Sequence, residues 1–305
     1  MIPSALPKVS IFIPTFNDRT DLLACLESIR QIDYPKDKIE IIVWDNASSD
    51  DTAAAVRPLF SEMESARWMG LKLIEWDKNE GSYIPYNLVQ EHLSPESQYI
   101  LGLDADVELS GNTLIDLVNA AQEDRVAAVG ARSVYYDNPT LTSHGAGFVN
   151  RWTGFYGEKD PETGIECDYV IGCCWLLNRN IFKLLGGFDP AYYINHWEVD
   201  YCLRAKQKGF RIVYEPGAIA RHKIPLRGTL NPERVYYLYR NKIKLIKKTF
   251  SPTQRGVALL LNFTFGLSKA VVESVIRNRS VKVTEIKLIL KAFRDGCLNK
   301  SGKVV

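Results

Sequence analysis

The chain has 305 residues, of which 46% are hydrophobic and 24% are charged, the composition of a globular protein. This length allows a full hydrophobic core, in one large domain or in one domain with a smaller one beside it. The net charge of +2 excludes a chain-wide attraction to nucleic acid, so we expect no nucleic-acid partner.

The first half of the chain alternates apolar runs, typical of buried strands, with residues at helical spacing. We expect strands over residues 8–16, 38–46, 71–77, 99–109 and 126–135, and helices over 19–32, 48–60, 84–93 and 113–124. This alternation predicts an α/β fold with a Rossmann-like, mostly parallel central sheet flanked by helices. Ligands bind at the carboxyl ends of the strands in such sheets, where four polar clusters fall: Thr15–Asp18, Asp45–Ser49, Asp77–Gly81 and Asp104–Asp106.

The character of the chain changes near residue 230. Residues 137–195 have the pattern of loops and short strands, whereas aromatic, basic and strongly apolar segments follow residue 230. We therefore expect a main domain over 1–230 and a helical, basic and amphipathic region over 231–305. The apolar run in this region is shorter than the roughly 20 residues that a membrane-spanning helix needs.

The C-terminal region allows two interpretations. Lys242, Lys244, Lys247 and Lys248 cluster in it, and each contributes about 1 kcal/mol at an anionic membrane surface. The region then lies on a membrane surface or on a partner. Alternatively, it is an ordinary helical subdomain that packs on the sheet.

The six cysteines form no CxxC pair, and three of them lie in apolar runs. A disulfide framework is not expected in a chain of this length, so we predict reduced, mostly buried thiols of a cytoplasmic protein. The adjacent Cys173 and Cys174 have an apolar setting and no neighbouring histidine in the sequence, which argues against thiol catalysis.

Two carboxylates, Asp104 and Asp106, end the apolar run "YILGL". Aspartate is depleted in strands, and a buried charge without a partner is costly. Carboxylate oxygens suit Mg²⁺ or Mn²⁺, whose other ligands are often water and substrate phosphates. The alternative is that both acids lie in a solvated turn.

Five motifs, taken in order, resemble glycosyltransferase family 2. They are "VSIFIPTFND", "IIVWDNASSDDT", "DKNEGSYIPYN", "LGLDADVEL" and "HWEVDYCLRAKQKGF", and the resemblance covers about residues 8–245. Members of that family have the GT-A fold and use nucleotide-sugar donors. The later "GGFDPAYY" and "YYLYRN" are most similar to rhamnosyltransferase-like and galactofuranosyltransferase-like bacterial branches, which build cell-surface polysaccharides.

The resemblance implies roles for residues at the strand ends. Asp104 and Asp106 match the family's metal-binding D-x-D, where the cation bridges the donor phosphates. Asp45 matches the acid that accepts a hydrogen bond from the base, as a carboxylate can; alternatively, it caps the segment 48–51. The donor-binding positions that the resemblance implies are Thr15, Asn17, Asp45, Asn79, Gly81, Asn87 and Asp104. The chain departs from the family between Gly81 and Asn87, where Tyr83, Ile84 and Pro85 replace small residues.

Glu198 is the expected catalytic base. The family pattern has two acids, a variable residue and then Asp, and in this chain Trp197 replaces the first acid. Glu198 then matches the second acid, which removes the proton of the attacking hydroxyl. Asp200 matches the last acid, with a structural role as the favoured alternative, through capping or pairing with Arg204. The structural alternative for both residues is that acidic side chains stabilise a helix when they lie near its N-terminus.

The resemblance implies further positions around the base. His222 follows Glu198 by 24 residues, the spacing at which a histidine completes the metal site in galactofuranosyltransferase-like relatives. Gly172, His196, Trp197 and Asp200 are candidates for the acceptor site, because flat aromatic faces suit sugar rings and glycine permits close backbone approach. Arg240 and Asn241 match a recurrent pair of the bacterial branch; alternatively, they lie on a solvated helix face.

Together these features predict a metal-dependent, inverting glycosyltransferase with Mn²⁺ or Mg²⁺ as its cofactor. It would transfer a sugar from a UDP- or dTDP-linked donor to a saccharide or lipid-linked saccharide, at the inner face of the plasma membrane. A sugar nucleotidyltransferase is the second possibility, although "PTFNDRT" lacks the glycines of a phosphate loop. A non-catalytic saccharide- or nucleotide-binding protein is the third.

Overall fold

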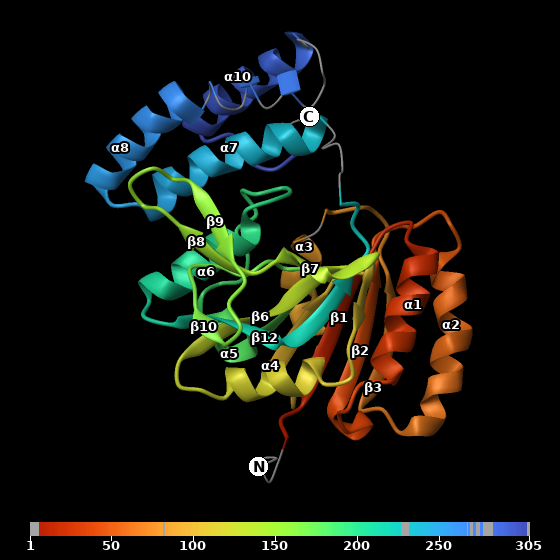
Figure 1. Cartoon of the computed structure of the whole chain (residues 1–305). Coiled ribbons are helices and arrows are strands. Elements are labelled where there is room, and N and C mark those ends of the chain that lie inside the picture. Colours follow the sequence, from red (N-terminus) through yellow and green to blue (C-terminus); the bar gives the residue numbers. More distant parts are fainter. Residues whose placement is uncertain are drawn as a thin grey trace.

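The computed structural model describes residues 6–81, 83–226, 232–266, 268, 271–272, 275–276 and 283–303. A central mixed sheet carries helices on both faces, and further helices lie across its upper end (Figure 1). The strands are β1 (Val9–Thr15), β2 (Ile39–Asp45), β3 (Gly70–Glu75), β4 (Tyr99–Leu103), β5 (Val107–Leu109), β6 (Val126–Tyr135), β7 (Asn138–His144), β8 (Ala146–Val149), β9 (Tyr156–Lys159), β10 (Ile165–Glu166), β11 (Cys174–Asn178) and β12 (Arg211–His222). The helices are α1 (Arg19–Arg30), α2 (Thr52–Met63), α3 (Ile84–Leu88), α4 (Thr113–Ala121), α5 (Arg179–Leu184), α6 (Trp197–Gln207), α7 (Pro232–Thr249), α8 (Pro252–Leu261) and α10 (Val283–Cys297).

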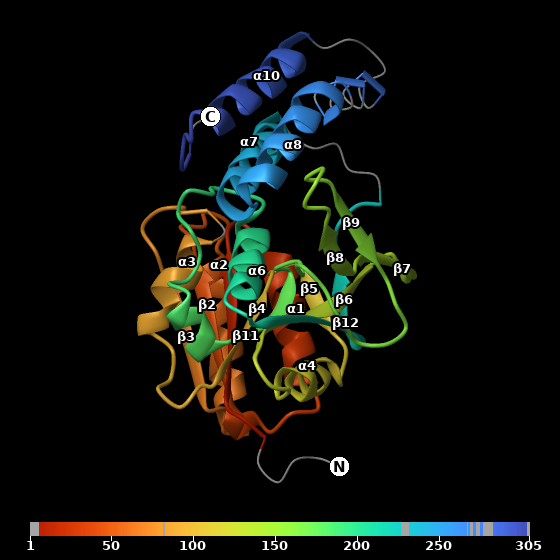
Figure 2. The ribbon, with the colours of Figure 1, turned by 90° about the vertical axis from the view of Figure 1, so that its left-hand side faces the viewer.

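The sheet has the strand order β10-β12-β6-β11-β4-β1-β2-β3. Strands β3, β2, β1 and β4 run parallel, as expected from their helical crossovers. Strand β11 is antiparallel to both β4 and β6, so the sheet is mixed in its middle. Strands β8 and β9 form a separate hairpin that stands above this sheet (Figure 2).

Alternation along the strands divides the core into two parts. Ile11 and Ile13 of β1 face an aliphatic core shared with α1, α2 and α4, whereas Phe12 faces an aromatic core on the other side. The same division separates Val43 from Trp44 in β2. Burial on both faces explains why these strands are continuously apolar.

Two expected elements differ from those observed. The run 99–109 is not one strand, because the chain turns at residues 104–106 between β4 and β5. The expected helix over 84–93 is only the short α3, followed by a 3-10 turn at Val89–Glu91. The six cysteines are free thiols, five of them buried, as expected.

Helices α7, α8 and α10 form a layer over the carboxyl ends of the parallel strands (Figures 1 and 2). The boundary expected at residue 230 falls among residues 227–231, outside the described part of the chain. In the described ranges we find no helix with the length and apolar character needed to cross a bilayer.

The four clustered lysines of α7 have partners within the protein. The Lys244 amine is buried and donates to the carbonyl of Lys300 at 2.9 Å, and Lys247 donates to the carbonyl of Cys297. The Lys248 amine lies 2.6 Å from Asp189, and Lys242 lies over the ring of Phe155 at 4.4 Å. These amines bind other parts of the protein, which favours the alternative that this region packs on the rest of the protein.

Gly102 of β4 gives a test of the aromatic core. A Cβ atom there would lie 2.5 Å from the Tyr86 hydroxyl and 2.6 Å from the Trp175 indole nitrogen. We expect Gly102→Ala to lower the free energy of unfolding by about 1–3 kcal/mol, because a packed core cannot absorb the added methyl group. Urea denaturation followed by tryptophan fluorescence measures this change.

Gly157→Ala is the control, since no atom lies within 4 Å of a Cβ at that position. We expect it to change stability by less than about 0.5 kcal/mol. Equal stabilities of the two variants would contradict this account of the aromatic core.

Candidate active site

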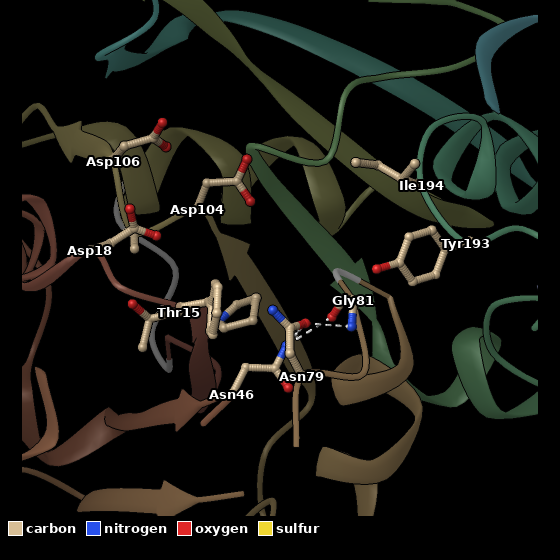
Figure 3. A pocket seen from close by; sticks show the side chains of 12 residues that line it. Thr15, Asp18, Asn46, Asn79, Gly81, Asp104, Asp106, Tyr193 and Ile194 are labelled. Carbon is tan, nitrogen blue, oxygen red and sulfur yellow. Dashed lines mark hydrogen bonds between the residues drawn. The ribbon is translucent and has the colours of Figure 1, made fainter. Parts of the chain in front are cut away.

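A cleft of about 360 Å³ opens where β1 and β4 end (Figure 3). Asp18, Asp104 and Asp106 lie along one side of it, and Tyr193 and Ile194 lie on the opposite side (Figure 3). The residues that line the cleft are Pro14, Thr15, Phe16, Asp18, Asn46, Asn79, Gly81, Asp104, Ala105, Asp106, Tyr193 and Ile194. Five of the predicted site residues are among them: Thr15, Asn79, Gly81, Asp104 and Asp106.

Strand pairing brings His222 to the two carboxylates. Strand β5 runs antiparallel to the end of β12, with Val107 opposite His222, and the backbone amide of Lys223 donates to the carbonyl of Asp106 at 3.0 Å. The His222 Nε2 atom consequently lies 3.3 Å from the Asp106 Oδ1 atom. One ligand atom from each of Asp104, Asp106 and His222 falls within 4.8 Å of the others.

The charges of this trio shift the pKa values of Asp104 and His222. Burial, and next the negative charge of Asp106, raise the pKa of Asp104 to about 7. Burial disfavours the His222 imidazolium, but its contacts with Asp106 and Cys173 outweigh burial and raise its pKa to about 11. Two carboxylates and one imidazole are a donor set that fits Mn²⁺ or Mg²⁺, and a cation would take the place of the proton on His222.

Three polar groups form the floor of the cleft. The Asn46 side chain donates to Asn79 Oδ1 at 3.2 Å and to the Gly81 carbonyl at 3.1 Å, and it accepts from the Glu80 amide. Asn79 Oδ1 also accepts from the Gly81 amide, as Figure 3 shows. This network gives the turn at 79–81, where Gly81 has a φ of +81°, a single shape.

Three of the predicted donor-binding residues do not line the cleft but bind neighbouring backbone segments. Asn17 accepts from the Ser49 amide at 2.7 Å, and Asp45 accepts from the Ser48 amide at 3.0 Å, which is the capping alternative considered for Asp45. Asn87 exchanges two hydrogen bonds of 2.9 Å with the backbone of Phe188. This placement favours a structural role for Asn87 over the donor contact that we expected.

Glu198 lies in the first turn of α6, and its Oε2 atom is buried with no hydrogen-bond partner in the described ranges. Burial, opposed by a backbone hydrogen bond and reinforced by the charge of Asp104, raises its pKa to about 7. A carboxyl group with this pKa is suited to accept a proton near neutral pH.

Other unpaired polar atoms lie near Glu198. The Asn195 amide nitrogen, the His196 Nδ1 atom and the Tyr156 hydroxyl are all buried without a partner among the residues described. The rings of Tyr156 and His196 are 5.2 Å apart, and burial lowers the pKa of His196 to about 3, so this histidine is neutral. Buried polar groups without partners indicate a site for water or a polar ligand.

The other three acceptor-site candidates, Gly172, Trp197 and Asp200, have contacts within the protein that account for them. Trp197 is buried in the aromatic core against Phe188, with ring centroids 4.7 Å apart, and a Cβ on Gly172 would lie 2.7 Å from the Trp197 ring. Asp200 is 0% exposed and binds Arg204 and Lys248, both at 2.7 Å. This geometry favours the structural alternative for Asp200.

Several residues at the site were missed by the sequence analysis. Asp18 and Asn46 each follow a predicted strand within a polar cluster, so their position in the sequence was a usable signal. Tyr193, Ile194 and Tyr156 come from loops and a hairpin that no periodic pattern marks, and only the tertiary structure brings them to the cleft or to Glu198.

Comparisons with known proteins agree with this geometry. The profile of Glycosyl transferase family 2 matches residues 10–186. The chain is 32% identical over 325 residues to the GalNAc(5)-diNAcBac-PP-undecaprenol beta-1,3-glucosyltransferase of Campylobacter jejuni, covering 98% of both chains. It is 29% identical over 252 residues to the O-antigen biosynthesis protein RfbC of Myxococcus xanthus, covering 76% of this chain but only 19% of that protein.

A solved structure has the same fold. The mannosyltransferase PcManGT of Pyrobaculum calidifontis, in complex with GDP-Man and Mn²⁺, superposes with a TM-score of 0.63 at 19% identity, covering 98% of this chain and 89% of the other. The chain belongs to glycosyltransferase family 2 and has the GT-A fold.

Proposed function

We propose that this protein transfers a sugar, with inversion, from a nucleoside-diphosphate sugar to a saccharide or lipid-linked saccharide acceptor. The observation that carries the proposal is the convergence of Asp104, Asp106 and His222 at the cleft, with Glu198 nearby as an unpaired carboxylate. The structural neighbour from Pyrobaculum calidifontis supports a metal and nucleotide-sugar site, because it holds Mn²⁺ and GDP-Man.

Asp104, Asp106 and His222 would hold Mn²⁺ or Mg²⁺, which when bound supplies positive charge to the leaving diphosphate. Asn46, Asn79 and Gly81 would bind the donor through the polar turn they form. Thr15, whose hydroxyl is buried without a partner among the described residues, offers a further donor contact.

Glu198 would act as the general base. The acceptor oxygen forms a bond to the anomeric carbon from the face opposite the leaving group, and its proton passes to Glu198 as the bond to the diphosphate oxygen breaks. The unpaired atoms of Asn195, His196 and Tyr156 would orient the acceptor sugar through its hydroxyl groups. A bound saccharide would satisfy polar atoms that are otherwise desolvated at a cost.

The acceptor is proposed to be lipid-linked, as the name of the Campylobacter jejuni relative states for that protein. Five apolar side chains in α8, the turn after it and the neighbouring loop are exposed at the C-terminal layer: Trp152, Val257, Leu260, Phe263 and Phe265. The loop that carries Trp152 is joined to this helix, because Asn262 donates to the carbonyl of Thr153 at 2.7 Å. We propose that this surface, rather than the lysines of α7, rests on the inner face of the plasma membrane.

The first test is a panel of UDP-, dTDP- and GDP-sugars, scored for binding and for hydrolysis with Mn²⁺ or Mg²⁺. We expect Glu198→Gln to bind the donor and to lose about 10²- to 10⁴-fold in kcat, because it cannot take up the proton. We expect Asp106→Asn to abolish the metal dependence of binding.

Glu108→Gln is the matched control, since Glu108 lies two residues beyond Asp106 but pairs with Lys223 at 2.9 Å. Its kcat should stay within about threefold of wild type. Donor binding without turnover in the wild-type protein would favour the non-catalytic alternative, and full turnover by Glu198→Gln would eliminate Glu198 as the base.

The raised pKa of Glu198 predicts a pH dependence of kcat. The base is active when it is deprotonated, so kcat should be level above a pH of about 7 and fall about tenfold for each unit below it. Steady-state rates at saturating donor, between pH 5 and 9, measure this profile. A kcat that is independent of pH across this range would contradict the assignment.

Membrane contact is tested by co-sedimentation with vesicles of phosphatidylcholine and phosphatidylglycerol. Leu260 is 64% exposed and Phe265 is 69% exposed, so the double variant Leu260→Ser, Phe265→Ser should reduce the bound fraction at least fivefold. Leu184→Ser is the control, because Leu184 is equally exposed on α5, far from α8 (Figure 1). Failure of the wild-type protein to sediment would end this part of the proposal.

A further inference from the structure

Helix α7 carries two polar residues, Arg240 and Asn241, that are 0% exposed. The alternative that they lie on a solvated helix face is therefore wrong. Both residues face the loop 188–196, which precedes α6 and Glu198. Polar groups buried to this extent are expected to have specific partners.

The hydrogen bonds of this pair are directed at the loop. The Asn241 side chain donates to the carbonyls of Ile194 at 2.7 Å and Asn195 at 3.0 Å. Its Oδ1 atom accepts from Arg240 Nε at 2.8 Å, so Arg240 keeps the amide group turned with its donors toward the loop. Arg240 also donates to the carbonyl of Ala191 at 3.3 Å and to that of Gly302 at 2.7 Å.

The loop has an unusual backbone at the point where Asn241 holds it. Asn195 has a φ of +61° and His196 a φ of +67°, a left-handed conformation that is uncommon outside glycine and that Asn and His adopt more readily than other residues. Two such residues in succession persist only where surrounding contacts impose them. Helix α6 starts directly afterwards at Trp197, so this backbone sets the direction in which Glu198 points.

The opposite side of the loop is held by the segment after Gly81. The Tyr83 hydroxyl donates to the carbonyl of Pro190 at 3.0 Å, and Asn87 exchanges its two hydrogen bonds with Phe188. Tyr83 is one of the bulky residues that depart from the family pattern, and its long side chain reaches from the N-cap of α3 to the carbonyl of Pro190. The loop is therefore fixed both by α3 with its N-cap residue and by the C-terminal layer.

We propose that Arg240 and Asn241 are positioning residues, which hold the loop 188–196 so that Glu198 faces the cleft. This inference rests on the proposed function, in which Glu198 is the general base. It also assigns part of the active-site geometry to the region 231–305, beyond the main domain expected over 1–230. A small displacement of a catalytic group is enough to reduce turnover about 100-fold.

The test compares Asn241→Asp with Asn262→Asp in the full chain. Asn262 is the matched control, because it is also 0% exposed and its side chain also donates to two carbonyls, those of Thr153 and Ala258, both at 2.7 Å. In both variants a carboxylate oxygen replaces the donating nitrogen and faces those carbonyls. Arg240→Lys is a milder third variant that keeps the positive charge and loses the fork of donors.

We expect Asn241→Asp to lower kcat for donor hydrolysis by about 10- to 100-fold with donor KM changed less than threefold. Asn262→Asp should lower the melting temperature comparably but keep kcat within threefold, and Arg240→Lys should have an intermediate kcat. Hydrogen exchange followed by mass spectrometry should be faster across residues 189–197 in Asn241→Asp and unchanged there in Asn262→Asp.

Wild-type kcat in Asn241→Asp, or an equal loss of kcat in Asn262→Asp, would overturn the proposal. If the wild-type protein turned over none of the donors, the proposed function would fail. Hydrogen exchange would then test the inference by itself. Unchanged exchange across 189–197 in Asn241→Asp would show that Asn241 does not hold the loop 188–196, and faster exchange would support that role.

Discussion

The half-buried negative charge at the end of β4 is the constraint on which the site depends. Asp104 and Asp106 lie where the chain turns from β4 into β5, and burial together with the charge of Asp106 raises the pKa of Asp104. Positive charge must therefore reach them from elsewhere in the fold. The pairing of β5 with β12 supplies His222, and the remaining imbalance suits a divalent cation.

The walls of the cleft are built from groups whose hydrogen bonds are largely made within the protein. Asn46 and Asn79 hold the turn at Gly81, and Asn17 and Asp45 hold the loop behind it. This pre-formed arrangement leaves little conformational entropy to be lost when a ligand binds. The unpaired atoms near Glu198 stand in contrast, since they are desolvated and still have hydrogen-bonding capacity to offer.

The C-terminal layer is joined to the loop 188–196 and to α6 by polar contacts. Lys248 reaches Asp189 and Asp200, while Arg240 and Asn241 bind backbone carbonyls of the same loop. Buried polar contacts of this kind specify one geometry, because each partner left alone would be desolvated without compensation. The basic side chains of α7 thus have partners within the protein, whereas apolar side chains of α8 are exposed.

The alternation of strands and helices, the polar strand ends and the resemblance that singled out Asp104, Asp106, His222 and Glu198 can all be recognised without a structure. These features are local, since they depend on side-chain periodicity and on short motifs. Which side chains face the cleft depends on the three-dimensional packing of the chain. Asn87, Trp197 and Asp200 carry the right chemistry for a site, but each finds its partners inside the protein, and Tyr193 and Tyr156 reach the site from segments without a periodic signal. Burial and partner geometry arise from residues distant in the chain, so no local pattern of the sequence contains them.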